Sequence, residues 1–321
     1  MDEKEIDFYI DGVRAGNRRT LAKAITLIES AHPVHRKLGR SVVDRLLPHT
    51  GKSVRLGITG VPGVGKSTFI ESFGMMLVEK GLQVAVLAVD PSSTRSGGSI
   101  MADKTRMERL SVAPGAFIRP SPSGGTLGGV GRMTRETLLI CEAAGFDVVV
   151  VETVGVGQSE TTVASMVDFF LVLMLAGAGD ELQGIKKGVL ELADAVAINK
   201  ADGDNLEKAA KARRSYEMAL HLLNPATPTW SPPVLTCSAL TLAGIDTLWT
   251  TIQDYRQRLS ATGELNQKRR RQALAWMWSR IEDGLKERFF GNPEISCRLR
   301  EVEAAVERGE PVSYTHLRAH E

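Results

Sequence analysis

The residues best suited to chemistry form a glycine-rich run near residue 60. The run reads Gly60-Val61-Pro62-Gly63-Val64-Gly65-Lys66-Ser67-Thr68. It fits the pattern G-x-x-x-x-G-K-S/T, in which backbone N–H groups surround a phosphate, the lysine reaches the β- and γ-phosphates, and the serine hydroxyl ligates Mg²⁺. An apolar strand is expected before the run, and an amphipathic helix from Phe69 to Val78 is expected after it. The positive end of that helix favours the same anion, so we predict a nucleoside triphosphate site here.

Two carboxylates stand directly after apolar runs that we interpret as strands. Asp90 follows Val84–Val89, and Glu152 follows Val148–Val151. The carboxyl ends of parallel strands lie at one edge of a sheet, where Mg²⁺ on a triphosphate needs acidic ligands. Gly155 follows Glu152 closely and can bring its backbone N–H to the γ-phosphate. The simpler alternative, that either carboxylate only caps local structure, stays open.

A third strand end carries residues suited to a purine base. Asn199-Lys200-Ala201-Asp202 follows the run Ala195–Ile198. A carboxylate at Asp202 can accept from the ring N–H and the 2-amino group of guanine, whereas adenine lacks that amino group. Losing two hydrogen bonds to a charged group, at roughly 1.5–3 kcal/mol each, predicts discrimination of at least about a hundredfold. A later strand end, Cys237-Ser238-Ala239-Leu240, suits a loop on the other side of the base, so we predict guanine rather than adenine.

The elements that must position these residues are short apolar runs alternating with helical stretches from Val54 onward. Runs without polar alternation are typical of strands covered on both faces, and the interleaved helices supply the crossovers of a parallel sheet. The pattern predicts an α/β fold with a doubly wound, mostly parallel sheet. The predicted strands are Val54–Thr59, Val84–Val89, Val148–Val151, Phe169–Leu175, Ala195–Ile198 and Val234–Thr236.

Four regions follow from this pattern: a helical N-terminal extension over 1–50, the α/β domain over 51–255, a helical arm over 256–312, and a tail over 313–321 that continues no pattern and has the character of a foreign segment. The arm carries a long apolar stripe, which needs a surface to pack on. We expect that surface to be a second copy of the chain, giving a homodimer, and packing on its own α/β domain stays the alternative. The stripe comprises Leu274, Met277, Trp278, Ile281, Leu285 and Phe289.

Composition excludes several classes of protein. With 43% hydrophobic and 24% charged residues among 321, the chain is an ordinary globular protein. A net charge of +2 and only 5% aromatic residues give no case for nucleic acid or membrane as the main partner. Three widely spaced cysteines fit a reducing compartment, and the acidic N-terminus is unlike a secretory signal. We therefore expect a cytoplasmic protein.

Taken together, these motifs resemble the MeaB/ArgK-type P-loop GTPases, which act as G-protein chaperones of adenosylcobalamin-dependent acyl-CoA mutases, above all methylmalonyl-CoA mutase. The resemblance runs from about residue 5 to about 310. It rests on the glycine-rich run, on Asp90-Pro91-Ser92-Ser93, on the stretch from Glu152 to Glu160, and on Asn199-Lys200-Ala201-Asp202. Two further stretches, 96–107 and 176–188, are more diagnostic than the generic motifs.

The resemblance implies a SIMIBI-like P-loop GTPase fold and roles for further residues. Asp90, Asp103 and Glu152 would be the acidic residues around Mg²⁺, and Asp103 and Arg106 would belong to the first switch. The segment from Asp180 to Lys186 would be a switch that responds to the partner mutase. Gln183 and Lys186 would then supply a hydrogen bond and a cation to transition-state charge, although Lys186 as an ordinary surface lysine stays open.

The function expected from this resemblance is a Mg²⁺-dependent GTPase, slow without its partner, that gates the loading and protection of adenosylcobalamin on the mutase. The chain shows no Asp-x-His-x-x-Gly motif, so we expect it not to bind cobalamin directly. One alternative is a nickel-insertion GTPase for hydrogenase or urease. Cys141 and Cys237 have no neighbouring histidine to favour it. The other alternative is an ATPase or kinase associated with amino-acid transport.

Overall fold

The computed structural model describes residues 3–30, 32–89, 107–120, 127–153, 159–177, 187–222 and 227–309. The chain divides into two compact units, Met1–Asn266 and Gln267–Glu321. The predicted start of the arm at residue 256 falls within helix α11 (Ile245–Ala261), which belongs to the first unit. The domain limits stay a prediction, and the tail over 313–321 lies outside the described residues.

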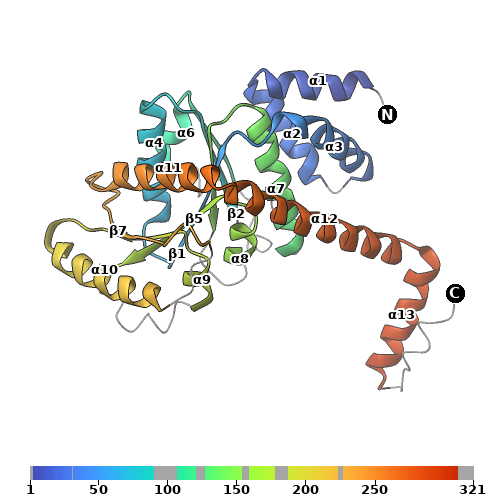
Figure 1. Cartoon of the computed structure of the whole chain (residues 1–321). Coiled ribbons are helices and arrows are strands. Elements are labelled where there is room, and N and C mark those ends of the chain that lie inside the picture. Colours follow the sequence, from blue (N-terminus) through green and yellow to red (C-terminus); the bar gives the residue numbers. More distant parts are fainter. Residues whose placement is uncertain are drawn as a thin grey trace. The chain divides into compact units, whose positions relative to one another are not determined.

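A seven-stranded parallel sheet forms the centre of the first unit (Figure 1). The strand order is β3-β2-β4-β1-β5-β6-β7, which places β1 in the middle and confirms the predicted α/β fold with a doubly wound parallel sheet. The strands are β1 (Val54–Gly60), β2 (Val84–Val89), β3 (Ala116–Arg119), β4 (Val148–Thr153), β5 (Phe169–Leu175), β6 (Ala195–Asn199) and β7 (Val234–Thr236).

Both faces of the sheet are buried, as the unbroken apolar runs predict. Side chains alternate between the faces along each strand. Leu56 and Ile58 of β1 belong to one hydrophobic core, whereas Gly57 between them faces the other side, where an added Cβ would meet Phe170 and Val167 at 2.7 and 2.9 Å. Glycine at this position thus permits close packing of the second layer against the central strand.

Helices cover the two faces in separate groups (Figure 1). Helix α4 (Lys66–Glu79) packs with α6 (Glu108–Val112) and α11 over the core that contains Leu56. Helices α7 (Leu127–Ala143), α8 (Ser159–Ala164) and α10 (Leu206–His221) contact the strands on the opposite face. Two short elements, α9 (Lys187–Glu191) and the 3-10 turn η3 (Gly203–Asn205), precede β6 and α10 respectively.

The N-terminal residues form helices α1 (Glu3–Arg14), α2 (Arg18–Glu29) and α3 (Pro33–Leu46), followed by the 3-10 turn η1 (Leu47–His49). Asn17 caps α2 by accepting hydrogen bonds from the backbone N–H groups of Arg19 and Thr20. All three helices contact α7, and a half-buried ion pair joins Glu29 of α2 to Arg119 at the end of β3. The extension is therefore tied to the edge of the sheet opposite β7.

The second unit contains most of α12 (Glu264–Phe290) and all of α13 (Pro293–Glu307). Its apolar stripe is exposed within the chain. The relative exposures are Leu274 55%, Met277 44%, Trp278 56%, Ile281 43%, Leu285 62% and Phe289 44%. None of the helices described here is long and apolar enough to cross a membrane.

Candidate nucleotide-binding site

The glycine-rich run connects β1, the central strand, to the first turn of α4. β1 ends at Gly60 and α4 begins at Lys66. A Cβ on Gly60 would lie 2.5 Å from the carbonyl oxygen of Leu173 in β5, so only glycine fits this close approach. Gly65 has a φ of 88°, a left-handed conformation that other residues rarely adopt, and it caps α4. The chain thus turns from strand to helix with the N-terminus of α4 at the carboxyl edge of the sheet.

Lys66 folds back over this turn. Its Nζ donates to the carbonyl oxygens of Gly60 at 2.8 Å and Val61 at 3.4 Å. Burial lowers the pKa of Lys66, and the carboxylates of Glu152 and Glu160 oppose that shift. The ammonium therefore lies inside the turn, in a partly desolvated position where an anion would bind strongly.

Ser67 in the first turn of α4 lies close to Glu152 near the end of β4. β4 pairs with β1 in parallel, with Ile58 opposite Glu152. The hydroxyl of Ser67 donates to Glu152 Oε1 at 3.4 Å, and the Glu152 side chain is largely buried. Two hard oxygen donors are thereby placed beside Lys66 at the same edge of the sheet.

The loop after β6 holds the glycine-rich run from the other side. Asn199 Nδ2 donates to the carbonyl of Val64 at 2.8 Å, and Lys200 Nζ donates to the carbonyl of Gly63 at 2.9 Å. Lys200 has a φ of 58°, a left-handed conformation that is uncommon outside glycine. The two predicted motifs therefore form one connected structure.

The same loop meets the one that follows β7. Asn199 Oδ1 accepts from the backbone N–H of Ala239 at 3.2 Å, and the Ser238 hydroxyl donates to Asp202 Oδ2. Leu240 is 82% exposed, in the turn after these contacts. The structure thus brings together Asn199, Asp202 and the loop from Ser238 to Leu240.

Among the predicted site residues, those from Gly60 to Thr68, Glu152, the loop from Asn199 to Asp202, and Ser238 to Leu240 share one edge of the sheet. The other predicted site residues lie outside the described part of the chain. They are Asp90, Asp103, Arg106, Gly155, Gln183 and Lys186.

Three further residues lie at the site beside those predicted to bind the nucleotide or Mg²⁺. Ser72 of α4 donates from its hydroxyl to the carbonyl of Ala239 at 2.7 Å, which ties α4 to the loop after β7. Cys237 Sγ lies 3.7 Å from Asn199 Oδ1, and burial raises its pKa to about 12. Glu160 is a buried carboxylate that acts on Lys66. Cys237 and Glu160 had a sequence signal, because Cys237 begins the run that ends at Leu240 and Glu160 stands in the stretch that begins at Glu152.

A parallel sheet with this strand-to-helix turn and this base loop defines a P-loop GTPase. The family model described as "Methylmalonyl Co-A mutase-associated GTPase MeaB" matches residues 21–294. The chain belongs to this family, and it is an enzyme that binds and hydrolyses GTP.

Individual relatives match nearly the whole chain. A "Putative GTPase" of Caulobacter vibrioides is 57% identical over 95% of this chain and 94% of the relative. "GTPase ArgK" of Escherichia coli is 52% identical over 99% of this chain and 96% of the relative. The mouse "Methylmalonic aciduria type A homolog, mitochondrial" is 45% identical over 96% of this chain and 77% of the relative.

A solved structure is similar over the full length as well. The "Crystal structure of LAO/AO transport system kinase" superposes with a TM-score of 0.78 at 45% identity, covering 99% of this chain and 97% of that one. The family model and the curated relatives confirm the family resemblance predicted from the motifs.

Proposed function

We propose that the protein is a GTP-dependent chaperone that gates the loading and protection of adenosylcobalamin on an acyl-CoA mutase, methylmalonyl-CoA mutase or a close relative. Membership of the family described as methylmalonyl-CoA mutase-associated carries this proposal. The mouse relative, named for methylmalonic aciduria, supports it. The protein itself would hold GTP or GDP and Mg²⁺ but not cobalamin.

The phosphates would lie over the turn from Gly60 to Thr68. Backbone N–H groups of this turn and the start of α4 favour negative charge. Lys66 would exchange its bonds to the carbonyls of Gly60 and Val61 for bonds to phosphate oxygens. Its partial burial strengthens that attraction, because less water competes for the ammonium.

The Mg²⁺ ligands would be Ser67 and Glu152 together with Asp90 and Asp103. The hydroxyl of Ser67 and Oε1 of Glu152 are 3.4 Å apart and offer the oxygen donors that Mg²⁺ prefers, so the described residues fit this ion. Bound there, Mg²⁺ supplies positive charge that offsets the triphosphate during hydrolysis. Gly155 would donate its N–H to the γ-phosphate.

The guanine would lie between the loops after β6 and β7, with Asp202 accepting from the ring N–H and the 2-amino group. The hydroxyl of Ser238 donates to Asp202, so this serine would hold the carboxylate in place. Asn199, Lys200 and Ala239 would complete the pocket by bracing one loop against the other. Leu240 would cover one face of the base.

Hydrolysis would depend on the switch residues Asp103, Arg106, Gln183 and Lys186. Arg106 and Lys186 would bring positive charge to the transition state, and Gln183 would donate a hydrogen bond. The partner mutase would place the segment from Asp180 to Lys186, so hydrolysis would be slow in the isolated protein.

We also propose a cytoplasmic homodimer that uses the arm over 256–312. The exposed stripe of α12 supplies apolar area of the kind that stable self-association buries. The tail over 313–321 has no part in this proposal, and neither nucleic acid nor membrane is proposed as a partner.

The test is binding of purified mutase to this protein loaded with GDP or with a non-hydrolysable GTP analogue. We expect an affinity that differs at least threefold between the two nucleotides, and a GTP hydrolysis rate that rises when mutase is added. Undetectable binding in both states, with folded mutase and folded GTPase, would refute the proposed partner.

A second candidate is a kinase associated with amino-acid transport, because the solved structure at 45% identity carries a transport-kinase title. The two functions differ in phosphate acceptor. Transfer of the γ-phosphate to a protein, with no release of inorganic phosphate, would favour the kinase. Nickel insertion was the other alternative, and stoichiometric binding of Ni²⁺ by the chain would be needed to support it.

A further inference from the structure

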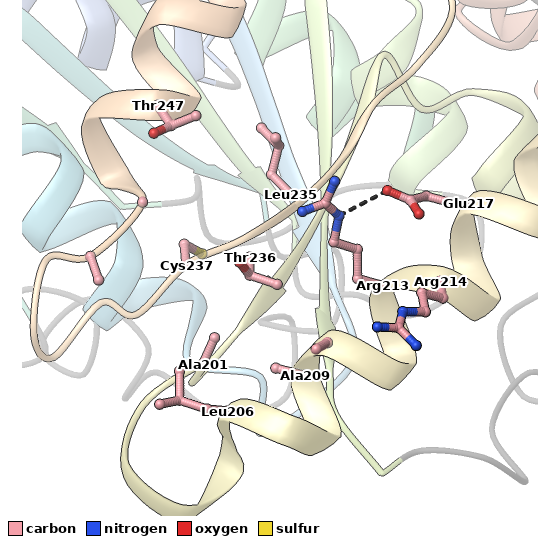
Figure 2. A pocket seen from close by; sticks show the side chains of 13 residues that line it. Ala201, Leu206, Ala209, Arg213, Arg214, Glu217, Leu235, Thr236, Cys237 and Thr247 are labelled. Atoms are coloured by element: carbon pink, nitrogen blue, oxygen red, sulfur yellow. Dashed lines mark hydrogen bonds and ion pairs between the residues drawn. The ribbon is translucent and has the colours of Figure 1, made fainter.

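A cleft beside the base-binding loops has no role in the function proposed above. Its volume is about 620 Å³, and it lies between α10, the edge strand β7 and the first turn of α11 (Figure 2). β7 is the last strand in the described sheet. The cleft therefore follows one open edge of the first unit.

The interior of this cleft is lined by small apolar groups. Ala209 and Ala210 of α10 and Leu235 of β7 line it, and Leu206 at the start of α10 is 57% exposed. Short side chains on the helix leave the space open. A larger apolar side chain from outside would be partly removed from water here, which is favourable.

The rim of the cleft is positively charged. Arg213 donates to Glu217 at 2.8 Å (Figure 2). Because this ion pair is solvent-exposed, it contributes little free energy and Arg213 can exchange Glu217 for another carboxylate. Arg214 forms no ion pair or side-chain hydrogen bond with any residue in the described part of the chain. Two arginines and one glutamate leave a net positive rim, which is complementary to carboxylates.

This combination suits a segment of a protein better than a small ligand. Small-molecule sites bury most of the ligand against convergent polar groups. Here the two arginines are exposed on a helix surface, and exposed arginine beside an apolar hollow is typical of protein interfaces.

The deep wall of the cleft belongs to the base-binding loops. Ala201 stands directly before Asp202, and Cys237 stands directly before Ser238. The backbone N–H of Ala201 donates to the carbonyl of Cys237 at 2.9 Å, which joins the two loops. A group wedged between α10 and β7 would separate this pair and so disturb the loops around the base.

We propose that an acidic segment of the partner mutase, with an apolar side chain next to its carboxylates, docks in this cleft and speeds nucleotide release. The inference rests on the proposed function for the identity of the partner. If docking also lowers the equilibrium affinity for nucleotide, linkage requires that bound nucleotide weakens docking by the same factor.

The test compares three variants of the full chain. Arg213→Glu with Arg214→Glu reverses the rim, and Ala210→Trp fills the hollow from an exposed position of α10. Lys208→Glu with Lys211→Glu is the matched control, since it makes the same charge change on exposed residues of α10 that do not line the cleft. Calorimetry gives mutase affinity, and release of fluorescent N-methylanthraniloyl-GDP gives the exchange rate.

We expect both cleft variants to bind mutase at least tenfold more weakly than the wild type and to lose the acceleration of release by mutase. The control should keep both properties, and release without mutase should stay within twofold in the control and in the arginine variant. If the wild type binds mutase and the cleft variants bind equally well, the docking site is wrong although the proposed function stands. If the wild type binds no mutase, both fail. Loss of self-association in the cleft variants, or an organic anion copurifying with the wild type alone, would identify a different occupant and overturn the proposal.

Discussion

Two helices near the end of the chain, α11 and α12, both carry apolar residues. These residues are buried in α11 and exposed in the stripe of α12. In α11, Tyr255 is buried, stacks edge-on against Phe169 and Trp230, and donates from its hydroxyl to the carbonyl of Asp168 at 3.0 Å. In α12, the apolar residues of the stripe are 43–62% exposed. The apolar residues of α11 are thus buried within the first unit, whereas about half of the surface of the stripe residues in α12 stays exposed to solvent. Self-association is the proposed use of that surface.

The comparison is sharpest for two leucines. Leu248 of α11 is fully buried, so Leu248→Ala should lower the free energy of unfolding by about 2–5 kcal/mol. Leu285 of α12 is 62% exposed, so Leu285→Ala should change that free energy by less than about 0.5 kcal/mol and instead weaken the proposed dimer. Denaturant titration at low protein concentration and sedimentation equilibrium measure the two effects. Similar losses of stability in both variants would contradict the contrast.

Removing the ammonium at the phosphate site should affect the first unit alone. Lys66→Ala is expected to weaken GTP binding at least about a hundredfold, or about 2.7 kcal/mol, because its ammonium lies among the backbone groups of the glycine-rich turn where the phosphates are proposed to bind. Self-association should be unchanged. Calorimetry tests the first expectation and sedimentation the second. Lys80→Ala at the far end of the same helix is the control, since its exposed ion pair with Asp246 should matter little. Full GTP affinity in Lys66→Ala would overturn the phosphate assignment.

A substitution at the base loop should redirect the site without weakening the fold. Asp202→Asn should weaken GTP about a hundredfold and favour xanthosine triphosphate, because the amide offers a donor where xanthine offers an acceptor. Competition binding with both nucleotides measures the exchange. Asp204→Asn, an exposed neighbour in η3, is the matched control. An unchanged preference would place the base elsewhere.

The smallest expected effect concerns pH. Burial lowers the pKa of Lys66, and only the charged ammonium attracts phosphate, so GDP affinity should fall as pH rises through that lowered pKa. The fall should reach at most about tenfold per pH unit, and binding should take up a proton in that range. Lys66→Arg is the control: arginine stays charged, so any pH dependence of GDP affinity in this variant comes from ionisation of the guanine base. Identical pH profiles in the two proteins would contradict the shift.

Local patterns predicted much of the site. The glycine-rich run was expected between a strand and a helix, and the structure has β1 and α4 there. Six of the seven strands were also predicted. The missed strand, β3, has four residues at the edge of the sheet with only Ala116 fully buried, so it has no continuous apolar run.

Contacts between distant segments were beyond the sequence. The hydrogen bond from Ser72 to the carbonyl of Ala239 joins residues 167 positions apart. The residues around Ser72 in the sequence do not indicate that its hydroxyl will bond to so distant a carbonyl. The cleft beside β7 is hidden for the same reason, because it exists only where α10, β7 and α11 meet.

The sequence alone determined the family of this protein and predicted its candidate site: the glycine-rich run, the carboxylate of Glu152, and the aspartate that we propose selects guanine. Motifs of this kind are set by short-range backbone geometry, which a few neighbouring residues specify. The tertiary structure decided the strand order, the joining of the loops after β6 and β7, and which apolar helix faces become covered. Those outcomes depend on burial between segments far apart in the chain, and burial is a property of the whole packed core.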